Sequence, residues 1–140
     1  MPTRKGNAVW QGSNTEGGGT ISFGGTSLPY TRAMRFEDAP GTNPEELLGA
    51  AHAACFTMAL AGNLTRAEFP PKNLNTTASV TLEKLAEGFK ITKIVLDVEA
   101  EVPGISPEVF MEKAEAAKKT CPVSMALGGV DEIVMNARLK

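Results

Sequence analysis

A long helix with no charge along most of its length is the strongest constraint on how this chain can fold. Residues 43–46 (Asn-Pro-Glu-Glu) are typical of a helix start, because asparagine caps, proline fits the first turn and two carboxylates face the positive end of the helix dipole. No charged residue occurs from Leu47 to Thr65, and we expect the helix to run to about Thr65. Much of the segment is alanine and glycine, whereas a membrane-spanning helix needs about 20 predominantly apolar residues. We therefore predict a buried helix of a soluble protein, whose small residues let a neighbouring backbone approach closely.

The composition narrows the class of protein further. The chain has 140 residues, with 14 basic and 16 acidic side chains and a net charge of −2. It therefore lacks the basic excess typical of proteins that bind nucleic acid or anionic membranes. Hydrophobic residues make up 42% of the chain, which excludes intrinsic disorder. The first residues contain no apolar segment of a secretory signal, and we expect a cytoplasmic protein consisting of one domain, residues 1–140.

Strands are expected on both sides of the long helix. A Gly-Gly pair at residues 24–25 indicates a hairpin turn, and the apolar phase slips near Lys93, as a β-bulge would cause. A second helix is expected to start at residues 106–108 (Ser-Pro-Glu), and Pro122 ends or restarts it. Strands mixed with two helices indicate an α+β fold. The expected strands are residues 7–11, 20–23, 27–36, 76–85, 89–102 and a last strand that includes residues 133–139.

Two cysteines, Cys55 and Cys121, are the residues most able to carry chemistry. They lie 66 residues apart, and two are too few for the disulfide framework of a small secreted protein. With one histidine in the chain, the usual Cys/His ligands cannot complete a tetrahedral zinc site. Each cysteine falls on an apolar stripe of its helix, so the pair is either two small buried hydrophobes or a redox pair. The two stripes are Leu47, Ala51, Cys55 and Met58 in the first helix and Phe110, Ala114, Ala117 and Cys121 in the second.

A reactive Cys55 would need a fixed positive charge, because an apolar setting raises the pKa of a thiol. Arg35 is the best candidate, since it precedes the loop that leads into the long helix. Arg32 is weaker, because three residues along a strand place it on the opposite face. Glu45 or Glu46 could supply the carboxylate that such an arginine requires. Each residue alone is more ordinarily a solvated strand arginine or a glutamate that complements the helix dipole.

Two segments resemble a known family. Residues 41–56 (Gly-Thr-Asn-Pro-Glu-Glu-Leu-Leu-Gly-Ala-Ala-His-Ala-Ala-Cys-Phe) and residues 121–124 (Cys-Pro-Val-Ser) are similar to the signature of the OsmC/Ohr family of thiol peroxidases. Residues 34–37 (Met-Arg-Phe-Glu) and the His-Ala-Ala-Cys-Phe run resemble its OsmC branch. The resemblance implies an OsmC-like fold, with antiparallel sheets packed on a long central helix, and an intertwined homodimer with two sites at its interface. It also implies reduction of organic hydroperoxides, and of hydrogen peroxide less efficiently, without a metal or organic cofactor.

The resemblance also implies roles for individual residues. By position, Cys55 matches the peroxidatic cysteine, Cys121 the resolving cysteine, Glu45 the catalytic glutamate and Arg35 the catalytic arginine. Cys55 would become a sulfenic acid, Cys121 would condense with it to a disulfide, and an external dithiol, typically lipoyl-type in the family, would reduce that disulfide.

Helix geometry adds an expectation about quaternary structure. Ten residues along a helix separate Glu45 from Cys55 by about 15 Å, which a glutamate side chain cannot span. If Glu45 acts at the Cys55 site, it must therefore come from the second subunit. We expect an obligate homodimer in which Glu45 of one chain braces Arg35 or the Cys55 pocket of the other.

Two functions of other classes compete with peroxide reduction. The alanine-rich helix could serve only as the dimer core of a non-enzymatic module that binds a hydrophobic ligand or a partner. Alternatively, Cys55 and His52, three residues apart, could form the nucleophile pair of a hydrolase, which would need a third group to orient the histidine. A structural role for His52 is the more ordinary interpretation.

Overall fold

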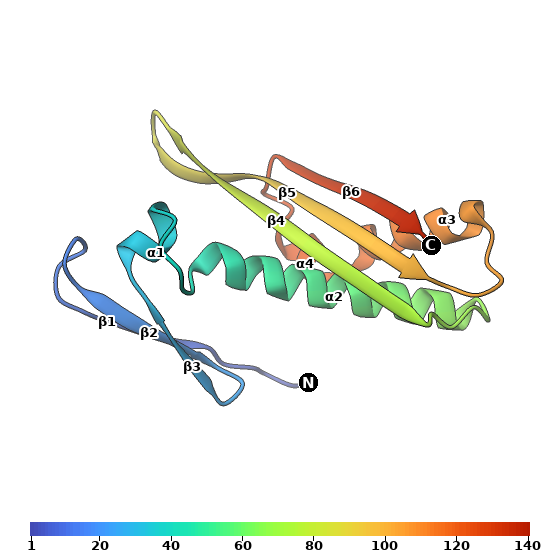
Figure 1. Ribbon diagram of the computed structural model, residues 1–140, viewed down its shortest axis with the longest axis horizontal. Helices are drawn as coiled ribbons and strands as arrows, with labels where there is room; N and C mark the ends of the chain where they lie inside the picture. Colours follow the sequence, from blue (N-terminus) through green and yellow to red (C-terminus); the bar gives the residue numbers. More distant parts are fainter. The chain divides into compact units, whose positions relative to one another are not determined.

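The structure, a computed structural model, describes residues 1–140 and divides them into two compact units, residues 1–47 and residues 48–140 (Figure 1). The division falls inside helix α2 (Pro44–Arg66), so the first turn of that helix belongs to the first unit.

A three-stranded antiparallel sheet forms most of the first unit. Strands β1 (Asn7–Gln11), β2 (Gly18–Phe23) and β3 (Thr26–Tyr30) lie in the order β1-β2-β3. Gly24 and Gly25 have φ values of +54° and +80° and make the turn between β2 and β3, which confirms the predicted hairpin.

Helix α1 (Arg32–Phe36) replaces the second half of the strand expected over residues 27–36, so that prediction was wrong there. Thr31 caps the helix, because its side chain accepts a hydrogen bond from the Met34 amide at 3.3 Å. Because this segment is a helix, the relation between the two candidate arginines changes. Residues three apart share a helix face, so Arg32 and Arg35 are neighbours rather than on opposite faces. Both guanidinium groups lie over the Phe36 ring, at 5.5 and 5.2 Å from its centroid.

The second unit contains the other sheet, in the order β4-β5-β6. Strands β4 (Asn73–Leu85) and β5 (Gly88–Glu101) form a long antiparallel hairpin. Thr81 pairs with Lys93 and Leu82 with Ile91, so Thr92 is one extra residue in β5. This confirms the bulge predicted near Lys93.

Strand β6 (Glu132–Leu139) pairs with β5 in parallel, which differs from the expectation of antiparallel sheets throughout. The reason lies in the connection. Helices α3 (Pro107–Thr120) and α4 (Pro122–Ala126) occupy the chain between β5 and β6, and they supply the long crossover that a parallel pair requires. Ser106 caps α3 as predicted, by accepting a hydrogen bond from the Val109 amide at 3.3 Å.

Helix α2 packs along one face of this sheet, with α3 on the same side (Figure 1). The stripe Leu47, Ala51, Cys55 and Met58, expected to face the core or an interface, does not face the core, because Ala51 is exposed and Met58 is 73% exposed. Larger apolar side chains determine the buried face instead, since they remove more apolar surface from water than alanine does. The buried residues of α2 are Gly49, His52, Phe56, Leu60 and Leu64. In contrast, the second predicted stripe, Phe110, Ala114, Ala117 and Cys121, is buried throughout.

By length and composition alone α2 could cross a membrane, with a mean hydropathy of 1.4 over its most apolar window. Its contacts are those of a core helix, because Phe56, Leu60 and Leu64 are fully buried in one cluster with residues of β5 and α3. Gly49 lies so close to β4 that a Cβ there would be 3.0 Å from the Ala78 carbonyl oxygen. The close approach predicted from the small residues is therefore to β4.

Candidate active site

The structure brings the two cysteines together from distant parts of the sequence. Cys55 is half-buried in the middle of α2, and Cys121 is fully buried at the junction of α3 and α4. Cys55 packs against the buried cluster that contains Cys121, each thiol shifts the pKa of the other, and both thiols are free. The sequence placed both on core-facing helices, and the fold adds that they lie close together. Two reduced thiols close together can form a disulfide after one of them is oxidised.

The surroundings of the two thiols differ. Burial, and then the hydrogen bond with Cys121, raise the pKa of Cys55. Burial also acts to raise the pKa of Cys121, but hydrogen bonds from Cys55, from the Ser124 backbone and side chain and from the Val123 backbone hold it below the ordinary value. No cation is among the groups that shift the pKa of Cys55.

His52 lies beside this pair but does not bond Cys55. Its Nε2 is 2.6 Å from the Ser124 Oγ, its ring is fully buried, and its Nδ1 has no hydrogen-bond partner. Burial lowers the pKa of His52, so the ring is neutral at pH 7. This geometry does not support the Cys-His hydrolase, and it agrees with a structural histidine. Sequence reasoning assigned no role to Ser124, although it stands three residues after Cys121, on the next turn of chain.

Arg35 and Glu45 form the second pair of predicted site residues that the structure brings together. The Arg35 Nη2 donates to the Glu45 Oε1 at 2.8 Å, and the Arg35 Nε lies 3.1 and 3.2 Å from the two carboxylate oxygens. Glu45 therefore pairs with Arg35 of its own chain, which differs from the expected pairing with Arg35 of a second chain. The other expected alternative, that Glu45 braces the Cys55 pocket of a second subunit, stays a prediction. Asn43 explains the geometry, because its side chain bonds the Met34 carbonyl at 3.1 Å and the Glu46 amide at 2.8 Å. It thereby holds the end of α1 against the start of α2.

The other two candidates for this charge pair have different partners. Arg32 forms an ion pair with Glu37 at 3.1 Å, and both side chains are exposed, at 41% and 65%. Exposed ion pairs of this kind contribute little to stability. Glu46 is exposed in the first turn of α2, where it complements the helix dipole.

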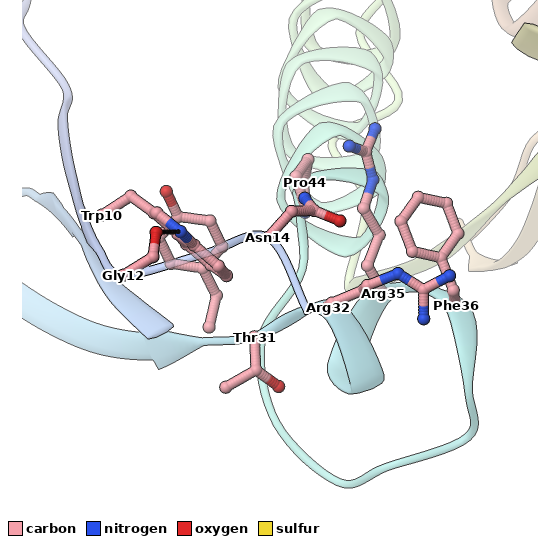
Figure 2. A pocket seen from close by; sticks show the side chains of 9 residues that line it. Trp10, Gly12, Asn14, Thr31, Arg32, Arg35, Phe36 and Pro44 are labelled. Carbon is pink, nitrogen blue, oxygen red and sulfur yellow. Dashed lines mark hydrogen bonds between the residues drawn. The ribbon is translucent and has the colours of Figure 1, made fainter. Parts of the chain in front are cut away.

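A pocket of about 440 Å³ opens beside Arg35 within the first unit (Figure 2). Trp10 lies on one side of it and Phe36 with the two arginines on the other. The Trp10 and Tyr30 rings meet edge to face, 5.2 Å between centroids. Aromatic walls with guanidinium groups suit an organic group that carries a polar or anionic end. The lining residues are Trp10, Gly12, Asn14, Tyr30, Thr31, Arg32, Arg35, Phe36 and Pro44.

No group of three or more metal-ligating side chains lies together in the chain. The chemistry available to the described residues is that of the thiol pair and of the arginine–glutamate pair.

Comparison with known proteins decides the family. Residues 36–134 match the family model described as "OsmC-like protein". The chain belongs to this family. It is 48% identical over 140 residues to the Peroxiredoxin OsmC of Escherichia coli, covering 98% of this chain and 96% of that protein. It is also 33% identical over 112 residues to the Organic hydroperoxide resistance protein OhrA of Bacillus subtilis, with 78% and 75% covered.

Solved structures confirm the OsmC-like fold. The crystal structure of an OsmC-like protein from Mycoplasma pneumoniae superimposes with a TM-score of 0.80 at 20% identity, covering 99% of this chain and 97% of that one. The family and the α+β class inferred from the sequence are therefore confirmed, while the roles of individual residues remain predictions.

Proposed function

We propose that this member of the OsmC-like family reduces organic hydroperoxides at Cys55, with Cys121 as the resolving thiol. That the chain is a thiol-dependent peroxidase follows from its 48% identity, over nearly its whole length, to a peroxiredoxin. The name of the Bacillus subtilis relative, an organic hydroperoxide resistance protein, supports the preference for organic hydroperoxides. The observation that carries the residue assignment is the proximity of two free thiols, Cys55 and Cys121.

The proposed cycle has three steps. The Cys55 thiolate attacks the distal peroxide oxygen, the O–O bond breaks, and the alkoxide takes up a proton and leaves as an alcohol. The Cys55 sulfenic acid then condenses with Cys121, forming the S–S bond and releasing water, which protects Cys55 from irreversible oxidation. An external dithiol, of the lipoyl type, restores both thiols by exchange. Hydrogen peroxide is the poorer substrate, because it has no organic group to place in an aromatic pocket.

Arg35 is the cation that we propose for the activation of Cys55. Burial raises the pKa of Cys55, so the thiolate requires a positive charge beside it. The ion pair with Glu45 holds the guanidinium in one orientation and leaves its remaining N–H donors for the thiolate or the peroxide. Arg32 is the weaker candidate, because its exposed pair with Glu37 holds it less firmly.

We further propose that the site is completed in a homodimer. An ideal helix places residues ten apart at about 15 Å, so the Arg35–Glu45 pair of one chain would serve Cys55 of its partner. The outer face of α2 supports close packing of two such helices, since Ala50, Ala51 and Ala54 are exposed and Met58 is 73% exposed. An exposed apolar helix face is typical of an interface.

The cytoplasmic location and the single-domain organisation expected from the sequence are part of the same proposal. A cytoplasmic location fits a protein that works with free thiols, because that compartment keeps cysteines reduced. Residues 1–140 are proposed to fold as one domain, since α2 runs unbroken through the division between the two units.

Thiol counting during peroxide addition tests the proposed function. One equivalent of an alkyl hydroperoxide should consume two thiols per chain and yield a Cys55–Cys121 disulfide in the mass spectrum. Multiple turnovers should then require a dithiol such as dihydrolipoamide. A non-enzymatic binding module would lose no thiols in proportion to the peroxide added, and that result would overturn the proposal.

A further inference from the structure

A buried hydrogen bond between His52 and Ser124 lies next to Cys121. The His52 Nε2 lies 2.6 Å from the Ser124 Oγ, and Ser124 lies in the first turn of α4, whose N-cap residue is Cys121. The Ser124 side chain is also among the groups that lower the pKa of Cys121. All three residues are buried: His52 and Cys121 are 0% exposed and Ser124 is 8% exposed. The peroxidase cycle described above uses neither His52 nor Ser124, yet buried polar groups are retained in a core only where hydrogen bonds satisfy them.

The unpartnered Nδ1 of His52 determines the direction of these hydrogen bonds. A neutral imidazole has one N–H and one bare nitrogen. If Nδ1 carried the hydrogen, a buried N–H would have no acceptor, and such orphaned donors are rare in proteins. With the hydrogen on Nε2, the ring donates to the Ser124 Oγ, and the unpartnered Nδ1 is an acceptor. The Ser124 hydroxyl, which accepts from His52, then has its own hydrogen available for the sulfur of Cys121.

We propose that Ser124 is a further catalytic residue, which donates a hydrogen bond to Cys121 during its attack on oxidised Cys55, and that His52 is its positioning residue. This inference rests on the proposed function of Cys121. No protein residue has to change its protonation permanently: the Cys121 thiolate attacks the Cys55 sulfur, the S–S bond forms, and the S–O bond breaks. The departing hydroxide combines with the proton that Cys121 released, giving water. Ser124 stabilises the thiolate without transferring its hydrogen.

The tautomer of His52 gives a direct test in the unmodified protein. Because the chain contains one histidine, its ring nitrogens give the single imidazole pattern in a ¹⁵N-labelled sample. The inference predicts a neutral ring with the hydrogen on Nε2 at pH 7. Hydrogen on Nδ1, or a ring that exchanges freely between both tautomers, would overturn the directed chain from His52 to Cys121.

The effect on Cys121 can be measured without any peroxide. In a Cys55→Ser background Cys121 is the remaining cysteine, so thiolate absorbance in the ultraviolet reports its titration alone, with Cys55→Ser/Cys121→Ser as the baseline. Ser124→Ala should move the midpoint upward by about one pH unit, since a hydrogen bond to a charged group of ordinary strength is lost. Ser124→Thr retains a hydroxyl and should restore the midpoint. Ser79→Ala, an exposed serine of β4, is the matched control. An unchanged midpoint in Ser124→Ala would contradict the inference.

The disulfide-forming step provides the kinetic test. A rise of about one unit lowers the thiolate population about tenfold at neutral pH, but a more basic thiolate is also more nucleophilic, so disulfide formation should slow about threefold in Ser124→Ala. More Cys55 should then reach the sulfinic acid in excess peroxide, which mass spectrometry detects. If the wild type forms no Cys55–Cys121 disulfide, the proposed function fails. The tautomer of His52 and the titration midpoint of Cys121 would still test the inference, because neither measurement requires peroxide. If the wild type forms the disulfide and Ser124→Ala forms it at the same rate, the inference about Ser124 is contradicted and the proposed function is not.

Discussion

Arg35 and Glu45 of the same chain face each other through a two-pronged ion pair, with the Arg35 Nη2 2.8 Å from the Glu45 Oε1 and the Arg35 Nε 3.1 Å from the same oxygen. The Glu45 side chain is 11% exposed and that of Arg35 is 39% exposed, so the carboxylate is the better shielded partner. These hydrogen bonds fix the orientation of the planar guanidinium, which a lysine ammonium could not reproduce. Glu45 is thus placed to orient Arg35, whichever thiol the arginine serves.

Removing the guanidinium should slow the oxidation of Cys55. Arg35→Ala is expected to raise the pH midpoint of Cys55 alkylation by a neutral reagent and to slow peroxide attack about tenfold or more, because the thiolate loses its counter-charge. Arg35→Lys should rescue activity in part, and Glu45→Gln should give a smaller loss than Arg35→Ala. Arg32→Ala is the matched control from the same helix. Equal midpoints in wild type and Arg35→Ala would assign the role elsewhere, and a raised midpoint in Arg32→Ala would assign it to Arg32.

Replacing Cys55 and replacing Cys121 should impair peroxide reduction in different ways. Cys55→Ser is expected to abolish peroxide reduction, since it removes the proposed nucleophile. Cys121→Ser should complete one turnover and then accumulate Cys55 sulfinic and sulfonic acids, because no second thiol traps the sulfenic acid. Steady-state assays with dihydrolipoamide and mass spectrometry of Cys55 distinguish the two variants. Full multiple-turnover activity in Cys55→Ser would refute the assignment of the nucleophile.

Mixed dimers test whether the site is shared between subunits. Glu45→Ala chains supply an intact Cys55, and Cys55→Ser chains supply an intact Arg35–Glu45 pair. In the proposed dimer, one site of the heterodimer has both lesions and the other has neither. Heterodimers isolated with two affinity tags should therefore recover about half of the wild-type activity. No recovery, with subunit exchange confirmed by mass, would place Glu45 in its own chain's site or outside catalysis.

Local signals made most of the fold predictable. The start of α2 was evident from residues 43–46, and the Asn43 cap on the Glu46 amide at 2.8 Å is the contact that such a pattern predicts. The bulge at Thr92 was visible because it shifts the alternation of apolar residues by one. In contrast, α1 is a single short helix, and one capped turn after a strand gives too little periodic pattern to separate it from a longer strand.

The arrangement of the candidate site was less predictable, because it depends on tertiary packing. The alanines of α2 fit either face, so the side of the helix that Phe56 and Leu60 bury could not be read from periodicity. The proximity of Cys55 and Cys121 joins two residues 66 positions apart, and the contact between His52 and Ser124 requires α4 to pack on α2. The motif resemblance identified both cysteines and included Ser124 in its second segment, but it gave no role to Ser124.

The buried His52 should make stability depend on pH. Its folded-state pKa is lowered by burial from the ordinary 6.5, so the unfolded chain binds a proton more readily than the folded one. The stabilising contribution is complete above about pH 7 and is lost as the pH falls below about 6.5, at up to about 1.4 kcal/mol per pH unit. Urea unfolding at about pH 7.5 and about pH 5.5 measures the loss, and His52→Gln should reduce it. An equal loss in His52→Gln would assign the dependence to other groups.

Two glycines of α2 should respond to alanine in opposite directions. At Gly49 a Cβ would lie 3.0 Å from the Ala78 carbonyl oxygen, so either α2 or β4 must shift. Such overpacking costs about 1–3 kcal/mol, which exceeds the gain of up to about 1 kcal/mol in helix propensity. At Gly62 the nearest atom is the Arg66 Nη1 at 3.3 Å, the end of a flexible side chain that can move away. Gly49→Ala is therefore expected to lower the free energy of unfolding and Gly62→Ala to raise it by about 0.5–1 kcal/mol, as measured by urea titration. If both substitutions stabilised the protein equally, α2 and β4 could not approach each other as closely as Gly49 allows.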